Sequence, residues 1–246
     1  MRPHLVLLMG LACVSTAQAD PVADLRAKLQ TLRADTPLKG VLEADYQEFD
    51  AKGVADKAKA AHLQLAFDSK DGLYIHLSPE LVRSLSAEEA RNVADPDSPT
   101  PQADLLQQMR FTHIQHVLSA ADGLSRLMDG ASLSGSKAAT LDGAAVTELD
   151  LALPMKLPAK AKEAASDYHG DLSVWVDNQG VPLRFQEKLH SKFCKFWFCI
   201  TVDEGYTGVL KLVDGRLVNA EYGYEIQQTG QGQDFHSKIV STLKLQ

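Results

Sequence analysis

The sequence has few of the residues on which several common protein classes depend. It contains three cysteines in 246 residues, too few for a fold held together by disulfides. Aromatic residues make up only 7% of the chain. No stretch approaches the ~20 consecutive apolar residues that a membrane-spanning helix needs, so we expect no transmembrane segment.

Motifs for cofactors and for nucleic acid are also missing. The chain has no glycine-rich phosphate loop, no dinucleotide fingerprint and no calcium loop, so we expect no cofactor. Its net charge of −7 at pH 7 argues against nucleic acid as the main partner. The same charge does not prevent contact with the apolar tails of lipids.

The first segment of the chain has the three parts of a cleaved secretory signal. Arg2 supplies the positive charge, an apolar run follows from 5 to 14, and Ala17-Gln18-Ala19 forms a small-x-small cleavage site. We therefore expect residues 1–19 to be removed and the mature protein to be soluble in the periplasm. The alternative is cleavage before Cys13 and lipidation there, which would anchor the protein at the outer membrane.

Most of the remaining chain has the pattern of β-strands. Apolar Leu63, Leu65 and Phe67 alternate with residues of the opposite face, the period of two that is typical of a sheet with one buried side. Asp-Gly pairs at 71–72, 142–143 and 214–215 favour tight hairpin turns. The predicted strands are 39–49, 57–68, 73–77, 132–140, 144–153, 172–176, 181–193, 199–207, 208–213, 216–227 and 234–245.

Helical spacing marks the start and the middle of the chain. Residues 21–34 form a predicted helix with Asp20 as its cap, and an insert at 79–129 holds two more. Within the insert, we expect a helix from Pro79 with Leu81, Val82 and Leu85 facing the core, a proline-rich loop at 95–101, and one long helix at 105–128. An interruption of that long helix at Gly123 is the alternative. A short helix is expected at 159–165.

These elements predict an α+β fold in one domain, residues 20–246. We expect a strongly curved antiparallel sheet of about ten or eleven strands, an unclosed β-barrel, covered by the N-terminal helix and the central insert. The helices are needed because a sheet of this size must either close or be covered on its apolar face.

Cys194 and Cys199 are the two cysteines of the mature chain. With residues 195–198 as a four-residue turn, they would face each other across a hairpin, so we predict a disulfide. The aromatic residues Phe196, Trp197 and Phe198 lie between the two cysteines. Two interpretations stay open: these rings form an exposed tip that contacts a membrane, a partner or cargo, or they cap the mouth of the half-barrel from within.

The sequence shows no catalytic set and no metal-ligand set. His113 and His116 are three residues apart on the long predicted helix, but no third ligand follows at a fixed spacing, which favours ordinary rim histidines. Glu88 and Glu89 read as solvated acids on a helix. We therefore expect a protein without catalytic activity.

The order of elements resembles the LolA and LolB class of periplasmic lipoprotein carriers. The likeness is carried by the opening helix with Gly40-Val41-Leu42, by the strand 72–77 running into Ser78-Pro79, and by the stretch 172–184 with Trp175, Asp177, Gly180 and Pro182. This resemblance implies an unclosed barrel lidded by helices, an apolar cavity for acyl chains, and the shuttling of a lipid or lipidated protein.

The first functional hypothesis is therefore a periplasmic carrier whose concave apolar face holds lipid or the acyl part of a lipoprotein. Its candidate cavity residues are Leu63, Leu65, Phe67, Met109 and Val117. One alternative is a cell-envelope module that binds a protein partner, with its barrel filled by its own side chains. Another is a hydrolase, which a cluster of ionisable groups inside the cavity would favour.

Overall fold

A computed structural model describes residues 20–246 except 51, 110, 156, 158, 231 and 233. The expected signal sequence at 1–19, which includes Cys13, lies outside the described residues. Within the described part of the chain, no helix has both the length and the apolar character to cross a membrane.

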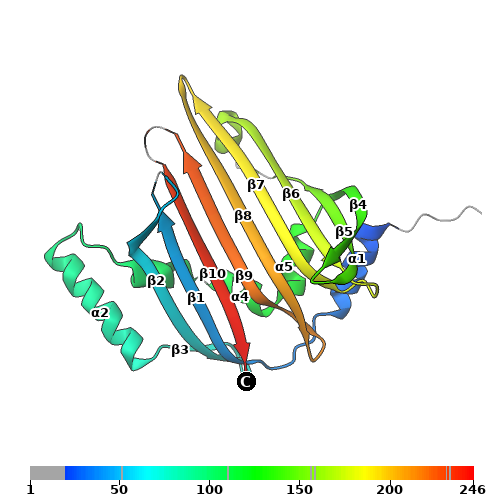
Figure 1. The fold of residues 1–246 in the computed structure, drawn as a ribbon, viewed down its shortest axis with the longest axis horizontal. Coiled ribbons are helices and arrows are strands. Elements are labelled where there is room, and N and C mark those ends of the chain that lie inside the picture. The colour runs from blue at the N-terminus through cyan, green and yellow to red at the C-terminus, as the bar shows by residue number, and fades with distance from the viewer. Residues whose placement is uncertain are drawn as a thin grey trace, which may run out of the picture.

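One antiparallel sheet of ten strands forms the body of the protein (Figure 1). Its strands follow the order β3-β2-β1-β10-β9-β8-β7-β6-β5-β4, so both edges are open and the predicted unclosed sheet is confirmed. The strands are β1 (Lys39–Phe49), β2 (Ala55–Asp68), β3 (Tyr74–His76), β4 (Ser132–Leu141), β5 (Ala144–Leu153), β6 (Ala165–Val176), β7 (Pro182–Lys195), β8 (Phe198–Val213), β9 (Arg216–Thr229) and β10 (Phe235–Leu245).

Helices cover one face of this sheet, which we call the inner face. The helices of the described chain are, in order, α1 (Pro21–Thr31), α2 (Pro79–Ala94), α3 (Pro101–Gln108), α4 (Phe111–Leu118), α5 (Ala120–Leu127) and α6 (Ala159–Ala164). Helices α4 and α5 pack on β9, α3 packs on β2, and α1 packs against α5. Helix α2 stands beyond the β3 edge of the sheet (Figure 1).

The starts of α1 and α2 follow from their local sequence. Asp20 accepts a hydrogen bond from the Val22 amide at 3.0 Å, and Ser78 accepts one from the Leu81 amide at 3.1 Å. A proline follows each cap in the first helical turn, where its missing N–H costs nothing. Both predicted helix starts are therefore confirmed.

The expected burial of α2 is wrong in part. Val82 is exposed, and Leu81 and Leu85 are only half-buried, because α2 stands off the sheet edge instead of lying on it. Glu88, expected to be solvated, is 4% exposed. Its carboxylate accepts hydrogen bonds from the amides of Gln102 and Ala103, so it caps the first turn of α3 and joins the two helices.

The single long helix expected at 105–128 is also wrong, since the structure has three short helices there. The break between α4 and α5 falls at Ser119. Arg216 of β9 donates to the Leu118 carbonyl at 2.7 Å, a group that a continuous helix would use itself, and to the Ser119 hydroxyl at 3.1 Å. Short segments can follow a curved sheet, and Arg216 fastens two of them to it.

The strand boundary expected between 207 and 208 does not exist, because Gly208 lies inside the continuous strand β8. A side chain at Gly208 would place its Cβ 2.1 Å from Cε1 of Phe185 and 2.3 Å from Oδ1 of Asn219. This glycine therefore permits a close approach instead of marking a turn. Strand β6 is likewise longer than expected, since it begins at Ala165 directly after α6.

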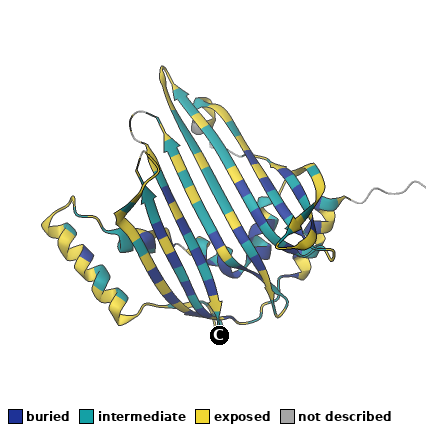
Figure 2. Cartoon of the chain, in the orientation of Figure 1, coloured by how far each residue is buried: buried dark blue, intermediate teal, exposed yellow. Residues whose placement is uncertain are grey.

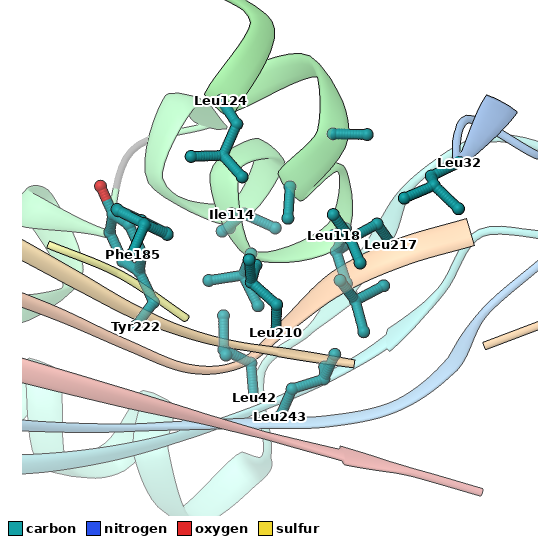
Figure 3. Close-up of a cluster of buried hydrophobic side chains, with 14 of the residues drawn as sticks. Leu32, Leu42, Ile114, Leu118, Leu124, Phe185, Leu210, Leu217, Tyr222 and Leu243 are labelled. Atoms are coloured by element: carbon teal, nitrogen blue, oxygen red, sulfur yellow. The ribbon is translucent and has the colours of Figure 1, made fainter. Parts of the chain in front are cut away.

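Burial is concentrated toward one end of the sheet. We call the end with the β7–β8 turn the upper end, and the end with the Asp214-Gly215 turn the lower end. Figure 2 shows buried residues in the lower half of the strands, and mainly half-buried or exposed residues toward the upper ends of β7, β8 and β9. The core in the lower half joins Leu42, Leu210, Leu217 and Leu243 of the sheet to Ile114, Leu118 and Leu124 of the helices (Figure 3).

Candidate ligand-binding site

The five cavity residues expected from sequence lie in the packed core. Leu63, Leu65 and Phe67 of β2 and Met109 and Val117 of the helical insert are each 4% exposed or less. All five belong to the continuous cluster of buried side chains between sheet and helices. Any ligand that touched them would first have to displace the helices.

A hollow of about 200 Å³ lies elsewhere on the inner face, where α4 and α5 meet β7, β8 and β9. Its walls combine apolar side chains with five polar ones. Its lining residues are His116, Ala120, Gly123, Leu124, Leu127, Phe185, Glu187, Leu189, Tyr206, Asn219 and Tyr222. Figure 3 labels three of them, with Phe185 and Tyr222 side by side at one end of the core cluster and Leu124 on the helix above.

The strand register brings these residues together. Glu187 of β7 is opposite Tyr206 of β8, and Phe185 is opposite Gly208, so all four share the inner face. The register between β8 and β9 shifts between Val209 and Leu210, which adds one residue to β9. This bulge places both Asn219 and Tyr222 on the inner face.

Glu187 is the most unusual of the lining residues, since it is a carboxylate only 6% exposed. Burial, followed by repulsion from Glu204, raises its pKa from 4.5 to about 7. No hydrogen-bond donor and no cation is among the causes of this pKa shift. The ionised form of Glu187 is therefore disfavoured in the folded protein.

The tyrosine hydroxyls around Glu187 remain protonated. Burial is the main cause that raises the pKa values of Tyr206, Tyr222 and Tyr224, the last to about 12. The Tyr206 hydroxyl donates to Oε2 of Glu204 at 3.0 Å. The rings of Tyr206 and Tyr224 have centroids 4.8 Å apart, so they form one aromatic surface beside the two carboxylates.

The two histidines of α4 face the sheet instead of solvent. His113 shares a hydrogen bond of 2.8 Å with the Ser241 hydroxyl, and the His116 ring stacks on Tyr222 with centroids 6.0 Å apart. Burial, then the charge of His116, lowers the pKa of His113 to about 4. The pKa of His116 is lowered as well, first by burial and then by Arg126. Both rings are neutral at pH 7.

Asn219 carries an acceptor without a partner. It is 2% exposed, and its amide nitrogen donates to the His116 carbonyl at 2.8 Å, which ties α4 to β9. Within the described part of the chain, its Oδ1 finds no hydrogen-bond partner. Leaving a buried acceptor unpaired costs about 1–3 kcal/mol, a cost that the fold carries at this position.

A wider hollow of about 430 Å³ lies on the outer face, around Gly205 and Gly223. Its walls are polar and include His190 of β7 and Asp203 of β8. These two share a hydrogen bond of 2.7 Å, and His236 near the same face bonds Glu225 at 2.8 Å. Because these outer-face groups hydrogen-bond with one another, they have less free hydrogen-bonding capacity for a ligand than Glu187 has.

The predicted disulfide between Cys194 and Cys199 is confirmed at the upper end of the sheet. The four-residue turn is not, since strand pairing continues to Lys195 and Phe198 and leaves a loop of two residues, Phe196 and Trp197. These two side chains are 84% and 82% exposed. They project into solvent and do not cap the half-barrel from within.

We expect Glu187→Gln to stabilise the protein at neutral and higher pH. A Glu whose pKa is raised on folding favours the folded state below about pH 4.5 and loses that contribution as the pH rises through 7. Glutamine does not titrate, so the variant should gain up to about 3 kcal/mol in unfolding free energy near pH 8 and almost nothing near pH 4.5.

Urea unfolding at the two pH values measures this difference, and Glu225→Gln on the outer face is the matched control. A gain for Glu187→Gln that is equal at both pH values would show that the Glu187 carboxylate is not buried as described.

The sequence favours ordinary rim histidines at 113 and 116 over a metal site. Among the described residues, no group of three or more His, Cys, Asp or Glu side chains is placed to hold a metal ion.

Sequence reasoning missed the residues that line the hollow. One signal was present: Phe185, Glu187 and Leu189 occupy the same face of a strand, so a carboxylate falls between two apolar positions of the period-two pattern. The contributions of Asn219 and Tyr222 depend on a bulge that no local pattern indicates.

Comparison with known proteins gave no relative: no protein-family model, no curated protein and no solved structure matches the chain.

Proposed function

We propose that the protein is an exported carrier that binds an amphiphile, such as a lipid or the acyl part of a lipoprotein, on the inner face of its sheet. The observation that carries this proposal is the continuation of the apolar inner face beyond α4 and α5. Above the hollow, Leu189, Phe193, Ile200, Val202 and Ile226 point to the inner face and are only half-buried.

This partly covered strip meets the hollow at Leu189 and Tyr206, which are half-buried lining residues. An amphiphile could therefore enter from the upper end without moving α4 or α5. Burying one large apolar side chain contributes about 1.5–3 kcal/mol, so a chain that covered several of these residues would bind favourably. In its absence, the strip remains a partly exposed apolar surface, a feature that can mark a binding site.

The tip, defined as Phe196, Trp197 and Phe198 with the adjoining disulfide, supports a role at a membrane surface. Two other two-residue hairpins of this sheet use Asp142-Gly143 and Asp214-Gly215, residues that adopt the required positive φ at little cost. At the tip, Phe196 takes a φ of 58°. A bulky residue in this conformation is strained, which favours a function for the ring over a structural reason.

Charge at the tip is consistent with contact with lipid. Lys192 and Lys195 flank the aromatic rings and are exposed. Aromatic rings with adjacent lysines suit the interface between apolar tails and anionic headgroups. The tip would then hold the upper end of the inner face, where the amphiphile enters, close to the membrane. The expected signal sequence and the disulfide support a periplasmic location.

Displacement of the neutral dye N-phenylnaphthylamine by decanol tests the carrier proposal. We expect dye binding by the wild type and about tenfold weaker decanol binding by Leu189→Gln, which loses apolar contact beside the hollow. The matched control is Leu212→Gln, at a site 46% exposed near the lower end. If neither dye nor decanol binds the folded protein, the carrier proposal is wrong and the envelope-module alternative is favoured.

The ionisable groups in the hollow favour a hydrolase as the second candidate. A carboxyl group with a pKa of about 7 suits general acid or base chemistry. The described lining residues include no serine, cysteine or lysine that could act as a nucleophile, so this candidate would have to activate water directly. Turnover of decyl acetate by the wild type and its loss in Glu187→Gln would support it.

A further inference from the structure

Glu187 is the one charged side chain among the described residues that line the hollow. It is 6% exposed, and within the described part of the chain no donor or cation compensates its carboxylate. No lysine or arginine is among its described lining residues. A ligand that satisfies this site must therefore bring donors of its own.

The sign of the local charge is negative. Glu204 lies on the same face as Glu187, one row higher in the sheet, and raises the pKa of Glu187 by repulsion. His116 does not offset the two acids, because it is held neutral. An anionic head, such as a fatty-acid carboxylate or a phosphate, would meet two carboxylates and no cation.

Aromatic faces complete the site. The Tyr222 ring lines the hollow, and the Tyr206 ring lies between Tyr222 and Tyr224, at centroid distances of 6.4 Å and 4.8 Å. Ring faces attract cations, and a desolvated cation gains about 2 kcal/mol from one such contact. A carboxylate combined with several tyrosines is the set of groups that recognises an organic ammonium.

We propose that the hollow binds the ammonium head of an amphiphile, with Glu187 as its counter-ion and the tyrosine rings as its walls. The apolar chain of the ligand then follows the inner face upward past Leu189. This inference rests on the proposed carrier function and adds the chemical class of the ligand head to it.

The same geometry explains why an unfavourable carboxylate is kept in the hollow. In the free protein the buried charge of Glu187 destabilises the fold, whereas a bound ammonium would neutralise it and donate hydrogen bonds. Binding should therefore strengthen as Glu187 ionises. The titratable groups that face it are His116 of α4, Glu204 and Tyr206 of β8, and Tyr222 of β9, with Arg126 of α5 acting on His116.

The test compares decylamine, decanol and decanoate as competitors of N-phenylnaphthylamine on the full chain. At about pH 8 we expect decylamine to bind at least about tenfold more tightly than decanol, the size of one charge-assisted hydrogen bond. Decanoate should bind more weakly than decanol. Glu187→Gln should reduce the preference for the amine over decanol to about twofold or less, whereas Glu225→Gln should leave all three affinities unchanged.

Each outcome decides between the two proposals. Equal binding of decylamine and decanol, or an amine preference that survives Glu187→Gln, overturns the ammonium site and leaves the carrier function standing. Failure of all three amphiphiles overturns both. Amine preference should also decline from about pH 8 to about pH 6, because protonation of Glu187 removes the counter-ion, and a preference that does not change over this range would contradict the assigned role of Glu187.

Discussion

Leu65→Asp is expected to unfold the protein instead of emptying a lipid cavity. Leu65 is 1% exposed in β2, where it lies opposite Leu42 of β1 in the core under the helices. Removing the leucine costs about 2–5 kcal/mol, and an unpaired buried carboxylate adds several kcal/mol more. Together these losses match most of the roughly 5–15 kcal/mol by which a typical domain is stable.

Circular dichroism and thermal unfolding measure this effect. Gln64→Asp is the matched control, since Gln64 is exposed on the opposite face of the same strand and should keep its melting temperature within a few degrees. A folded, cooperatively melting Leu65→Asp variant would mean that water or ligand reaches β2, and it would restore the sequence-based cavity to consideration.

The double variant Phe196→Asn with Trp197→Gly is expected to lose membrane binding and keep its fold. Asn-Gly is the pair that two-residue hairpins favour, so it removes the aromatic rings and relieves the strained conformation of Phe196 in one step. If each ring buries even half of its apolar surface in lipid, losing both weakens vesicle binding by about tenfold or more.

Co-sedimentation with vesicles of phosphatidylglycerol and phosphatidylethanolamine tests the tip. The wild type should bind more weakly as salt is raised, because Lys192 and Lys195 contribute through screened attraction. Unfolding midpoints of the two proteins provide the control for the fold. Equal vesicle binding by the variant and the wild type would remove the tip from the proposed mechanism.

Much of the fold could be predicted because its signals are local. The alternation through Leu63, Leu65 and Phe67 gives β2 and its buried face, and Asp20-Pro21 gives the start of α1. The spacing of Cys194 and Cys199 gave the disulfide, since residues that end a short hairpin face each other whatever the length of its loop. Each of these features is decided within about ten residues.

The candidate site could not be predicted because it depends on contacts between distant segments. Glu187 becomes a buried carboxylate only when the folded chain places Tyr206 opposite it and residues of α5 in the walls of the same hollow. Asn219 joins it through the bulge in β9. The break between α4 and α5 depends on Arg216, almost a hundred residues further along the chain, so the pattern of 105–128 still reads as one helix.

The carrier account is tested most directly by native mass spectrometry of the full protein, purified without detergent from the cells that produce it. We predict a second mass series, displaced from the protein alone by the mass of one amphiphile, that is depleted in Leu189→Gln and retained in Leu212→Gln. Fragmentation of that series should release a molecule with an amine head. A spectrum of ligand-free protein, unchanged after incubation with decylamine and decanol, would contradict the account.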